Sequence, residues 1–212
     1  MRTEINGVMA FPIHGHRKLR CEGYRTRDGH IIEWMSNLLR STQTGIEVIS
    51  RPEPVAKVIT DRFRARPRDN DLEGVDYIDP LTLRLPALKD RFRWWDDSLR
   101  FFPSRSHDAT GRVAVVWNPM LGRAEWWPNL CETAAHVHLD LLDDWTVHYA
   151  FRNLRAEVEQ SYRRMFNAAA TVTANSEGTL ALAHRFGRSD TRLLTNGSTP
   201  IGLIFRARRT AR

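Results

Sequence analysis

The sequence predicts an α/β fold in which a parallel β-sheet is flanked by helices. A strand, a helix and a second strand follow one another near both ends of the chain, within residues 7–50 and 169–195. Strands joined through a helix run parallel, because the crossover returns the chain to the same edge of the sheet. With 212 residues and a hydrophobic fraction of 42%, the chain is long and apolar enough for one sizeable domain.

The first predicted elements follow one another closely. Residues 7–11 form a short apolar run, typical of a buried strand, and residues 12–29 form a polar loop. Asp28 is expected to cap the next helix, because its carboxylate can accept the unpaired amides of the first turn. Residues 45–50 alternate as a second strand, which the prolines after it terminate. The helix between these strands is expected to bury an apolar stripe made of Ile31, Trp34, Met35, Leu38 and Leu39.

The middle of the chain carries weaker signals. Residues 61–71 are charged and predict a loop, whereas residues 81–85 alternate like a strand. Residues 91–103 interleave aromatic rings with arginines. Such a segment most often packs against a sheet. It is also suited to stacking on single-stranded nucleic acid or a sugar, or to lying at a membrane interface.

The second half of the chain returns to clear patterns. Residues 112–117 and 134–142 read as apolar strands, and residues 151–165 have the spacing of an amphipathic helix. The small and β-branched residues that follow, up to Ala174, predict another buried strand. The next helix should begin after Ser176, whose hydroxyl can accept an unpaired amide, and should end where Gly187 tolerates the left-handed conformation.

Composition limits the classes of function. The net charge of +7 comes almost entirely from arginine, since the lysines are only Lys18, Lys57 and Lys89. This balance suits nucleotide phosphates, polyanions or an anionic membrane surface, although an arginine bias spread over the whole chain also produces it. Two cysteines, Cys21 and Cys131, argue against a disulfide scaffold and for a reducing compartment such as the cytoplasm. No apolar run approaches the ~20 residues that cross a bilayer.

The strand ends in the second half form a recognisable pattern. One apolar strand ends in Trp-Asn-Pro, and the next ends in Asp-x-x-Asp-Asp. A third closes with Val-Thr-Ala-Asn-Ser-Glu, and after a helix a short strand at residues 192–195 leads to Asn-Gly. This pattern resembles the N-terminal domain of GT-B type glycosyltransferases, which use nucleotide-sugar donors. The matching residues are Trp117, Asn118, Pro119, Asp140, Asp143, Asp144, Val172, Thr173, Ala174, Asn175, Ser176, Glu177, Leu194, Thr195, Asn196 and Gly197.

The resemblance covers the last half of the chain well, and the first helix and second strand more loosely. Two positions depart from the family. Ala170 stands where the family usually has Asp, and Ser198-Thr199-Pro200 stands where an Asp usually follows the Asn-Gly. The second departure falls where the family's chain crosses into its second domain, so it concerns that crossing and not the sheet before it.

The resemblance implies a single Rossmann-like domain at residues 1–197, followed at residues 198–212 by a basic tail or truncated linker toward a missing donor-binding domain. In this family the C-terminal domain holds the nucleotide sugar and the N-terminal domain presents the acceptor. We therefore expect the acceptor-binding half of a hexosyltransferase-type enzyme, incomplete and inactive alone and without a cofactor. The implied partners are the nucleotide-sugar donor, bound through the missing domain, and a glycan or lipid-linked acceptor at the inner face of the membrane.

The candidate site residues follow from where loops lie in a parallel sheet. Ligands bind at the carboxyl ends of the strands, so the loops after strands are selected. Asp144 is the candidate catalytic residue, because a carboxylate can orient or deprotonate an acceptor hydroxyl. The alternative for one of the two adjacent aspartates is a turn carboxylate. The candidate acceptor-binding residues are Gly15, His16, Arg17, His30, Asn118, Asp143, Ser176 and Asn196.

Other chemistries find less support. His136, His138 and Asp140 share one face of a strand, a spacing that suits a metal ion, but no further ligand is identifiable and no metal is expected. Ser176 lacks the flanking glycines of a hydrolase nucleophile, and no Walker-type phosphate loop occurs. The alternative function is a basic, arginine- and aromatic-rich nucleic-acid-binding protein, resting on the net charge and residues 91–103. Nucleic acid is the less favoured partner.

Overall fold

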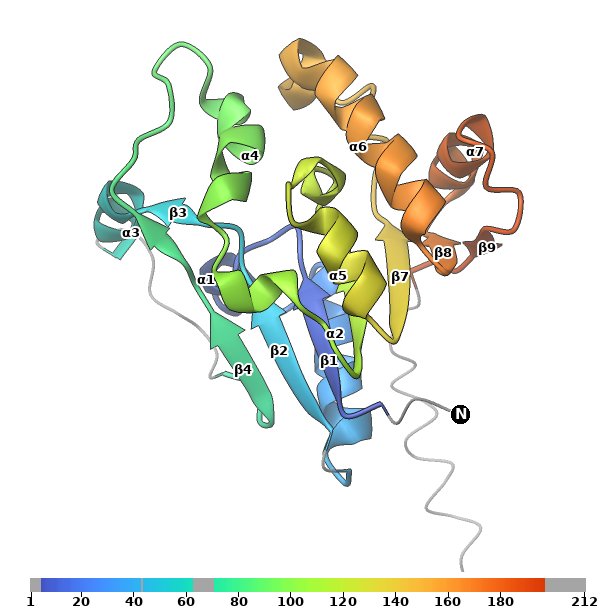
Figure 1. The fold of residues 1–212 in the computed structure, drawn as a ribbon. Helices are drawn as coiled ribbons and strands as arrows, with labels where there is room; N and C mark the ends of the chain where they lie inside the picture. The colour runs from blue at the N-terminus through green and yellow to red at the C-terminus, as the bar shows by residue number, and fades with distance from the viewer. Residues whose placement is uncertain (1–4, 43, 63–70, 197–212) are drawn as a thin grey trace, which may run out of the picture.

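The structure, a computed structural model, describes residues 5–42, 44–62 and 71–196. Within these ranges seven strands form one sheet in the order β4-β2-β1-β6-β7-β8-β9, and every neighbouring pair is parallel (Figure 1). The predicted parallel α/β fold is therefore confirmed. The strands are β1 (Gly7–Phe11), β2 (Gly45–Ile49), β4 (Val75–Ile78), β6 (Arg112–Val116), β7 (His136–Leu141), β8 (Thr171–Ala174) and β9 (Arg192–Leu193).

The order of the strands is that of a doubly wound, Rossmann-like sheet. The chain starts at β1 in the middle of the sheet, winds outward through β2 and β4, and then returns to β6 on the other side of β1. Its direction of winding reverses between β1 and β6, and open α/β sheets bind ligands at the carboxyl ends of the two strands on either side of this switch point. The small pair β3 (Glu53–Pro54) and β5 (Leu81–Thr82) forms a separate two-stranded sheet.

Helices cover both faces of the sheet, because alternate residues of its strands are apolar on both sides. Met9 and Phe11 of β1 belong to one hydrophobic core, and Val8 and Ala10 belong to the other. The first core contains side chains from α5 (Trp127–Thr133), α6 (Arg155–Ala168) and α7 (Glu177–Arg185), and the second contains side chains from α1 (His16–Cys21) and α2 (Arg27–Leu39). Among the described helices, none combines the length and apolar character needed to span a bilayer.

The first helical segment differs from the prediction. Residues 12–29 are not a continuous loop, since they contain α1 and the start of α2. Thr26 is the N-cap of α2, and its hydroxyl accepts the Gly29 amide. Asp28 lies inside the first turn instead, where it is fully buried and accepts hydrogen bonds from the amide and the ring of His14. The prediction that Asp28 caps the helix is therefore wrong. Asp28 instead makes a tertiary contact with His14, which lies in the loop after β1.

The buried face of α2 is also rotated from the predicted stripe. Ile32 is fully buried although it lies outside that stripe, whereas Leu38 is 76% exposed and Trp34 is 43% exposed. Ile31, Met35 and Leu39 pack against the second core as predicted. The apolar residues of α2 form a broad stripe, and packing against the sheet buries the side of it that contains Ile32.

The middle of the chain contains helices that its hydrophobic pattern did not predict. Residues 55–62 form α3 (Val55–Arg62), and the predicted strand at residues 81–85 is limited to β5. Of the charged segment 61–71, residues 63–70 lie outside the described part of the chain. The aromatic segment folds into α4 (Trp94–Asp97) with 3₁₀ turns around it, Arg91–Arg93 and Ser98–Phe101. Trp94 and Phe102 are buried, so this segment packs against the protein.

The C-terminal strand–helix–strand unit is confirmed. The side chain of Ser176 accepts the Thr179 amide, and the Thr179 hydroxyl accepts the Ser176 amide, so the two residues form a capping box at the start of α7. Gly187 follows the end of α7 with a φ of +85°, the conformation that favours glycine. The strand predicted at residues 192–195 is shortened to β9. Gly197 and the predicted tail at residues 198–212 lie outside the described residues.

Candidate functional site

The candidate site is the carboxyl edge of the sheet around the β1–β6 switch point. Most of the residues selected from the sequence come from the loops that leave β1, β6, β7, β8 and β9 at this edge. The distance from β1 to β8 is three strand spacings, about 14 Å. Contacts between side chains divide the edge into three groups, here called the His16 group, the aromatic bridge and the Asp144 group.

The His16 group lies after β1, β2 and β4. The His16 amide donates to the Ser50 hydroxyl at 2.9 Å. The His16 ring is stacked on Tyr77 with its centroid 3.7 Å away, and its Nδ1 and Nε2 atoms each lie 2.8 Å from a carboxylate oxygen, of Asp79 and Asp71 respectively. A ring that faces a carboxylate on both sides is best satisfied as an imidazolium, which donates from both nitrogens. Gly15 precedes this group and lies against Ser50.

The carboxylates around His16 raise its pKa more than burial lowers it. Burial lowers the pKa of His16, but the hydrogen bonds and charges of Asp79 and Asp71 raise it, and the net pKa lies above the ordinary 6.5. For Asp79, burial raises the pKa, whereas hydrogen bonds from His16 and Ser50 lower it, and the net pKa lies below the ordinary 3.8. The His16 contribution to stability is complete below pH 6.5 and is lost as the pH rises through the folded-state pKa. The Asp79 contribution is complete above pH 3.8 and is lost on acidification.

We therefore expect His16→Gln to change how stability depends on pH. The variant should lose about 1 kcal/mol of unfolding free energy near pH 5.5, where both partners are charged in the wild type, and less near pH 8.5. Urea unfolding followed by circular dichroism at these two values of pH measures the difference. His30→Gln removes a partly exposed histidine and is the matched control. Parallel stability curves for the wild type and His16→Gln would contradict the assigned ion pairs.

The aromatic bridge lies over the centre of the edge. Arg51, two residues after β2, places its guanidinium carbon 3.7 Å from the centre of the Trp95 ring. Trp95 contacts Phe151 edge-on at 5.5 Å, and Phe151 contacts Trp145 in the same manner at 5.2 Å. Trp145 directly follows Asp144, so four side chains connect the end of β2 to the loop after β7. Asn118 is buried directly after β6, where its backbone amide donates to the Phe11 carbonyl.

The Asp144 group lies after β7 and β8. Asp144 Oδ1 accepts the Thr146 amide and hydroxyl, as a turn carboxylate does, and Oδ2 accepts Arg185 Nη2 at 2.7 Å. Asp143 is exposed in the same loop. The Asn175 side chain donates to the Leu142 carbonyl, which brings Ser176 and the start of α7 next to this loop. A hollow of about 250 Å³ beside the group is lined by Thr146, Arg155, Glu159, Arg163, Arg185 and Phe186.

Asn196 is exposed and joins a polar network that is centred on the buried Asp140. Arg27, at the start of α2, donates from Nη1 to Asn196 Oδ1 and binds Asp140 through Nε and Nη2, each at 2.8 Å. The indole of Trp117 and the Thr173 hydroxyl also donate to Asp140. Thus both carboxylate oxygens of Asp140 are occupied by donors. No group of three His, Cys, Asp or Glu side chains within the described ranges is arranged to hold a metal ion.

Two predicted residues make contacts outside these groups, although the charge of Arg17 also helps to lower the pKa of Asp79 in the His16 group. His30 is the fourth residue of α2, and its contacts are with Glu33 at 3.8 Å and Trp34. It is therefore a surface side chain. Arg17 is in α1 and donates to the Val58 carbonyl at 3.0 Å, which ties α1 to α3. No contact between either residue and Asn118, Asp144 or Ser176 occurs among the described contacts.

Sequence reasoning missed the residues that join the groups. Arg51 is the exception with a local signal, because a cation that follows a parallel strand lies at the ligand-binding edge. Asp71, Asp79 and Arg27 gave no local signal, because their partners lie 55, 63 and 113 residues away in the chain. A separate hollow of about 490 Å³ lies at the opposite, amino edge near Gly7, Gly45 and Arg112. None of the candidate residues lines that hollow.

Comparison with known proteins adds no assignment to this geometry: no family model matches the chain, and no curated protein and no solved structure was found to match it.

Proposed function

We propose that this chain is the acceptor-binding half of a glycosyltransferase that takes its sugar from a nucleotide-sugar donor. The observation that supports the proposal best is the arrangement of the strand ends that resemble the GT-B family. Asn118, Asp144 and Ser176 follow β6, β7 and β8, which are three neighbouring parallel strands, and all three residues lie at the carboxyl edge. The donor is held by a second domain in this proposal, and the edge presents the acceptor hydroxyl to it.

The side chains at the edge are suited to holding a sugar. Aromatic rings such as Trp95 and Trp145 provide apolar faces for pyranose rings, and both rings are only partly buried. Carboxylate and amide groups next to them can bind hydroxyls in fixed directions. Asp144 is the proposed residue that orients the reacting hydroxyl, and Arg185 holds its carboxylate in one position. To act as a base, Asp144 would accept the acceptor proton on Oδ2, beside Arg185.

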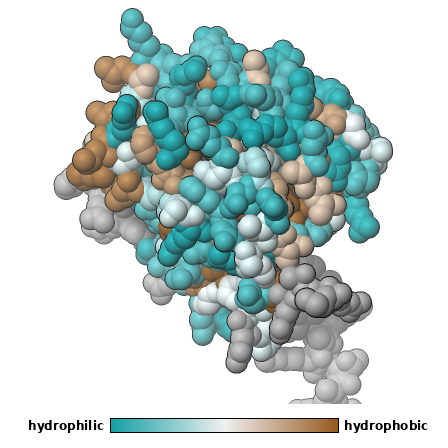
Figure 2. All heavy atoms as spheres, viewed as in Figure 1, coloured by the Kyte–Doolittle hydropathy of each residue, from teal (hydrophilic) through white to brown (hydrophobic). Residues whose placement is uncertain are grey.

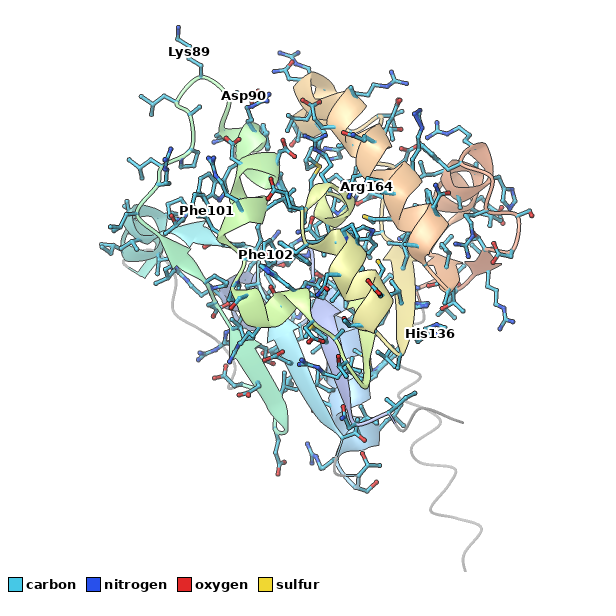
Figure 3. All side chains as sticks on the ribbon, viewed as in Figure 1. Lys89, Asp90, Phe101, Phe102, His136 and Arg164 are labelled. Atoms are coloured by element: carbon cyan, nitrogen blue, oxygen red, sulfur yellow. The ribbon has the colours of Figure 1, made fainter. Side chains whose placement is uncertain are left out.

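Residues 81–88, here called the exposed leucine loop, support the proposal that the acceptor is lipid-linked. Leu83 is 89% exposed and Leu88 is fully exposed, and Leu81, Leu85 and Ile59 are also more than half exposed. Figure 2 shows hydrophobic residues gathered on the side of the molecule where Figure 1 places α3 and β3, the strand that pairs with β5. Lys89 lies at the tip of the loop that rises from β5 (Figure 3). Leucines combined with cations are suited to the surface of an anionic membrane, which is where a lipid-linked acceptor lies.

The proposal is tested by amide NMR titrations of the purified chain with four probes. Farnesyl phosphate represents a lipid-linked acceptor, maltotriose a glycan, UDP-glucose the donor, and a thymidine oligonucleotide the alternative ligand. We expect one or both acceptor probes to shift the amides of Asn118, Asp144 and Ser176, and UDP-glucose to leave them unchanged. Asp144→Asn serves as the matched variant and should weaken acceptor binding about tenfold, because a hydrogen bond to a charged group contributes about 1.5 kcal/mol or more.

Two outcomes would contradict the proposal. One is tight binding of UDP-glucose at the edge, because the donor belongs to the other domain. The second is salt-dependent binding of the oligonucleotide alone, with shifts at Trp94 and Trp95, which would favour a nucleic-acid-binding protein. Trp94 and Phe102 are buried and therefore cannot stack on bases, which leaves partly buried rings such as Trp95 for that role.

A further inference from the structure

Arg51 is the described side chain whose environment is least explained by the fold. Its Nε and Nη1 atoms are buried, and no hydrogen-bond partner reaches them among the described residues. Buried polar groups in folded proteins are nearly always paired, and an unpaired buried cation is among the costliest exceptions. Burial lowers the pKa of Arg51 to about 10, so the guanidinium is still charged at neutral pH.

The nearby acid does not neutralise Arg51. The charge of Glu53 acts on the guanidinium, but the Glu53 carboxylate is bound by Lys57 Nζ. No ion pair joins Arg51 to any acid within the described ranges, whereas Arg27, Arg112, Arg123 and Arg185 each have a carboxylate partner. Arg51 is instead held by Trp95, over whose ring it lies at 3.7 Å. Stacking fixes the plane of the guanidinium while leaving its N–H donors available.

The position of Arg51 is that of a ligand contact. It follows β2 at the carboxyl edge, next to Ser50, whose hydroxyl binds the His16 amide. Arg51 as a whole is partly exposed, but its Nε and Nη1 atoms are buried, so a ligand has to reach the guanidinium through Nη2. Planar guanidinium groups bind phosphate and carboxylate oxygens through paired hydrogen bonds. A guanidinium that is charged, stacked and unpaired at this edge is suited to an oxyanion.

The exposed leucines indicate what kind of molecule carries the oxyanion that Arg51 binds. Glu53 and Pro54 of β3 pair with Leu81 and Thr82 of β5, so the leucine loop begins within about 12 Å of Arg51 along the backbone. An anion site beside an exposed apolar surface fits a molecule that has both a charged group and a hydrocarbon chain. Phosphate esters of long-chain alcohols are such molecules, and they carry sugars at membrane surfaces.

We propose that Arg51, stacked on Trp95, binds the phosphate group of the acceptor, and that the exposed leucine loop beside it receives the acceptor's hydrocarbon chain. This inference rests on the proposed function, since it names the chemical class of the acceptor at the same edge. It adds a residue that the family resemblance does not assign.

The test measures binding of inorganic phosphate, farnesyl phosphate and farnesol to the full chain by calorimetry and by the shift of the thermal midpoint. Both phosphates should raise the midpoint, and farnesyl phosphate should bind at least tenfold more tightly than inorganic phosphate. Arg51→Met should abolish both effects. Without ligand this variant should melt at the same temperature as the wild type or higher, because it removes an unpaired buried charge. Arg100→Met is the matched control, since exposed Arg100 also lies over an aromatic ring, that of Phe101.

The outcomes separate this inference from the function itself. Wild-type phosphate binding that survives in Arg51→Met, or no phosphate binding by the wild type, would overturn the inference. In that case binding of maltotriose at Asn118 and Asp144 would still support an acceptor-binding function. Equal binding of the two phosphates would overturn the assignment of the leucine loop and identify the ligand as a soluble phosphate. Phosphate binding at Arg51 without any effect of acceptor probes on Asp144 would support the inference and count against the glycosyltransferase.

Discussion

Replacing Asp140 with alanine is expected to lower the unfolding free energy by about 3–5 kcal/mol. Asp140 is 1% exposed and binds the nearly buried guanidinium of Arg27 through both of its oxygens. Removing the carboxylate leaves that cation without its partner in a region of low dielectric constant. The indole N–H of Trp117 loses its acceptor as well. Urea unfolding followed by circular dichroism measures the loss.

A second substitution separates the ion pair from the rest of the network. Arg27→Met in the Asp140→Ala background removes the stranded cation, so the double variant should be more stable than Asp140→Ala alone. Glu159→Ala is the control for an exposed pair, because Glu159 bridges Arg155 and Arg163 on the surface of α6 and should contribute about 1 kcal/mol or less. An Asp140→Ala variant that loses no more than the Glu159→Ala variant would show that Asp140 and Arg27 do not form a buried pair.

Replacing Gly122 with alanine is expected to destabilise the protein by about 3 kcal/mol through steric overlap. Gly122 is in the 3₁₀ turn Leu121–Arg123 and lies directly against α6. A Cβ atom there would overlap the Ser161 carbonyl oxygen and would lie 2.8 Å from Met165 Cγ. One obstacle is helix backbone, so relief requires α6 to move away from the first core. Thermal and urea unfolding measure the effect.

Gly178→Ala is the matched control for this steric argument. A Cβ atom at Gly178 would lie 3.8 Å from Ser176 Oγ, an ordinary contact, and Gly178 is in the helix α7. Alanine in a helix restricts the unfolded chain more than glycine does, so this variant should be more stable than the wild type by about 0.5–1 kcal/mol. A Gly122→Ala variant as stable as the wild type would mean that α6 and the turn are not packed as closely as the structure describes.

The sequence predicted the parts of this protein that depend on local patterns. The strands at residues 7–11, 45–50 and 112–117, and the capped helix after Ser176, have alternating or helical periods that appear within a few residues. Because strands joined by helices run parallel, these patterns also predicted that the loops after strands meet at one edge. That edge holds Asn118, Asp144 and Ser176, so the place of the candidate site followed from order along the chain.

The tertiary structure alone decided which side chains meet at that edge. Arg51 stacks on Trp95, and His16 lies between Asp71 and Asp79, although these partners are far apart in the chain. Packing also selected the face of α2 that contains Ile32, and it moved Asp28 from a helix cap to a buried contact with His14. Local periodicity determines whether a segment can be a strand or a helix. Which of its charged and apolar side chains are buried depends on segments distant in sequence, since burial and pairing are settled only when the layers pack together.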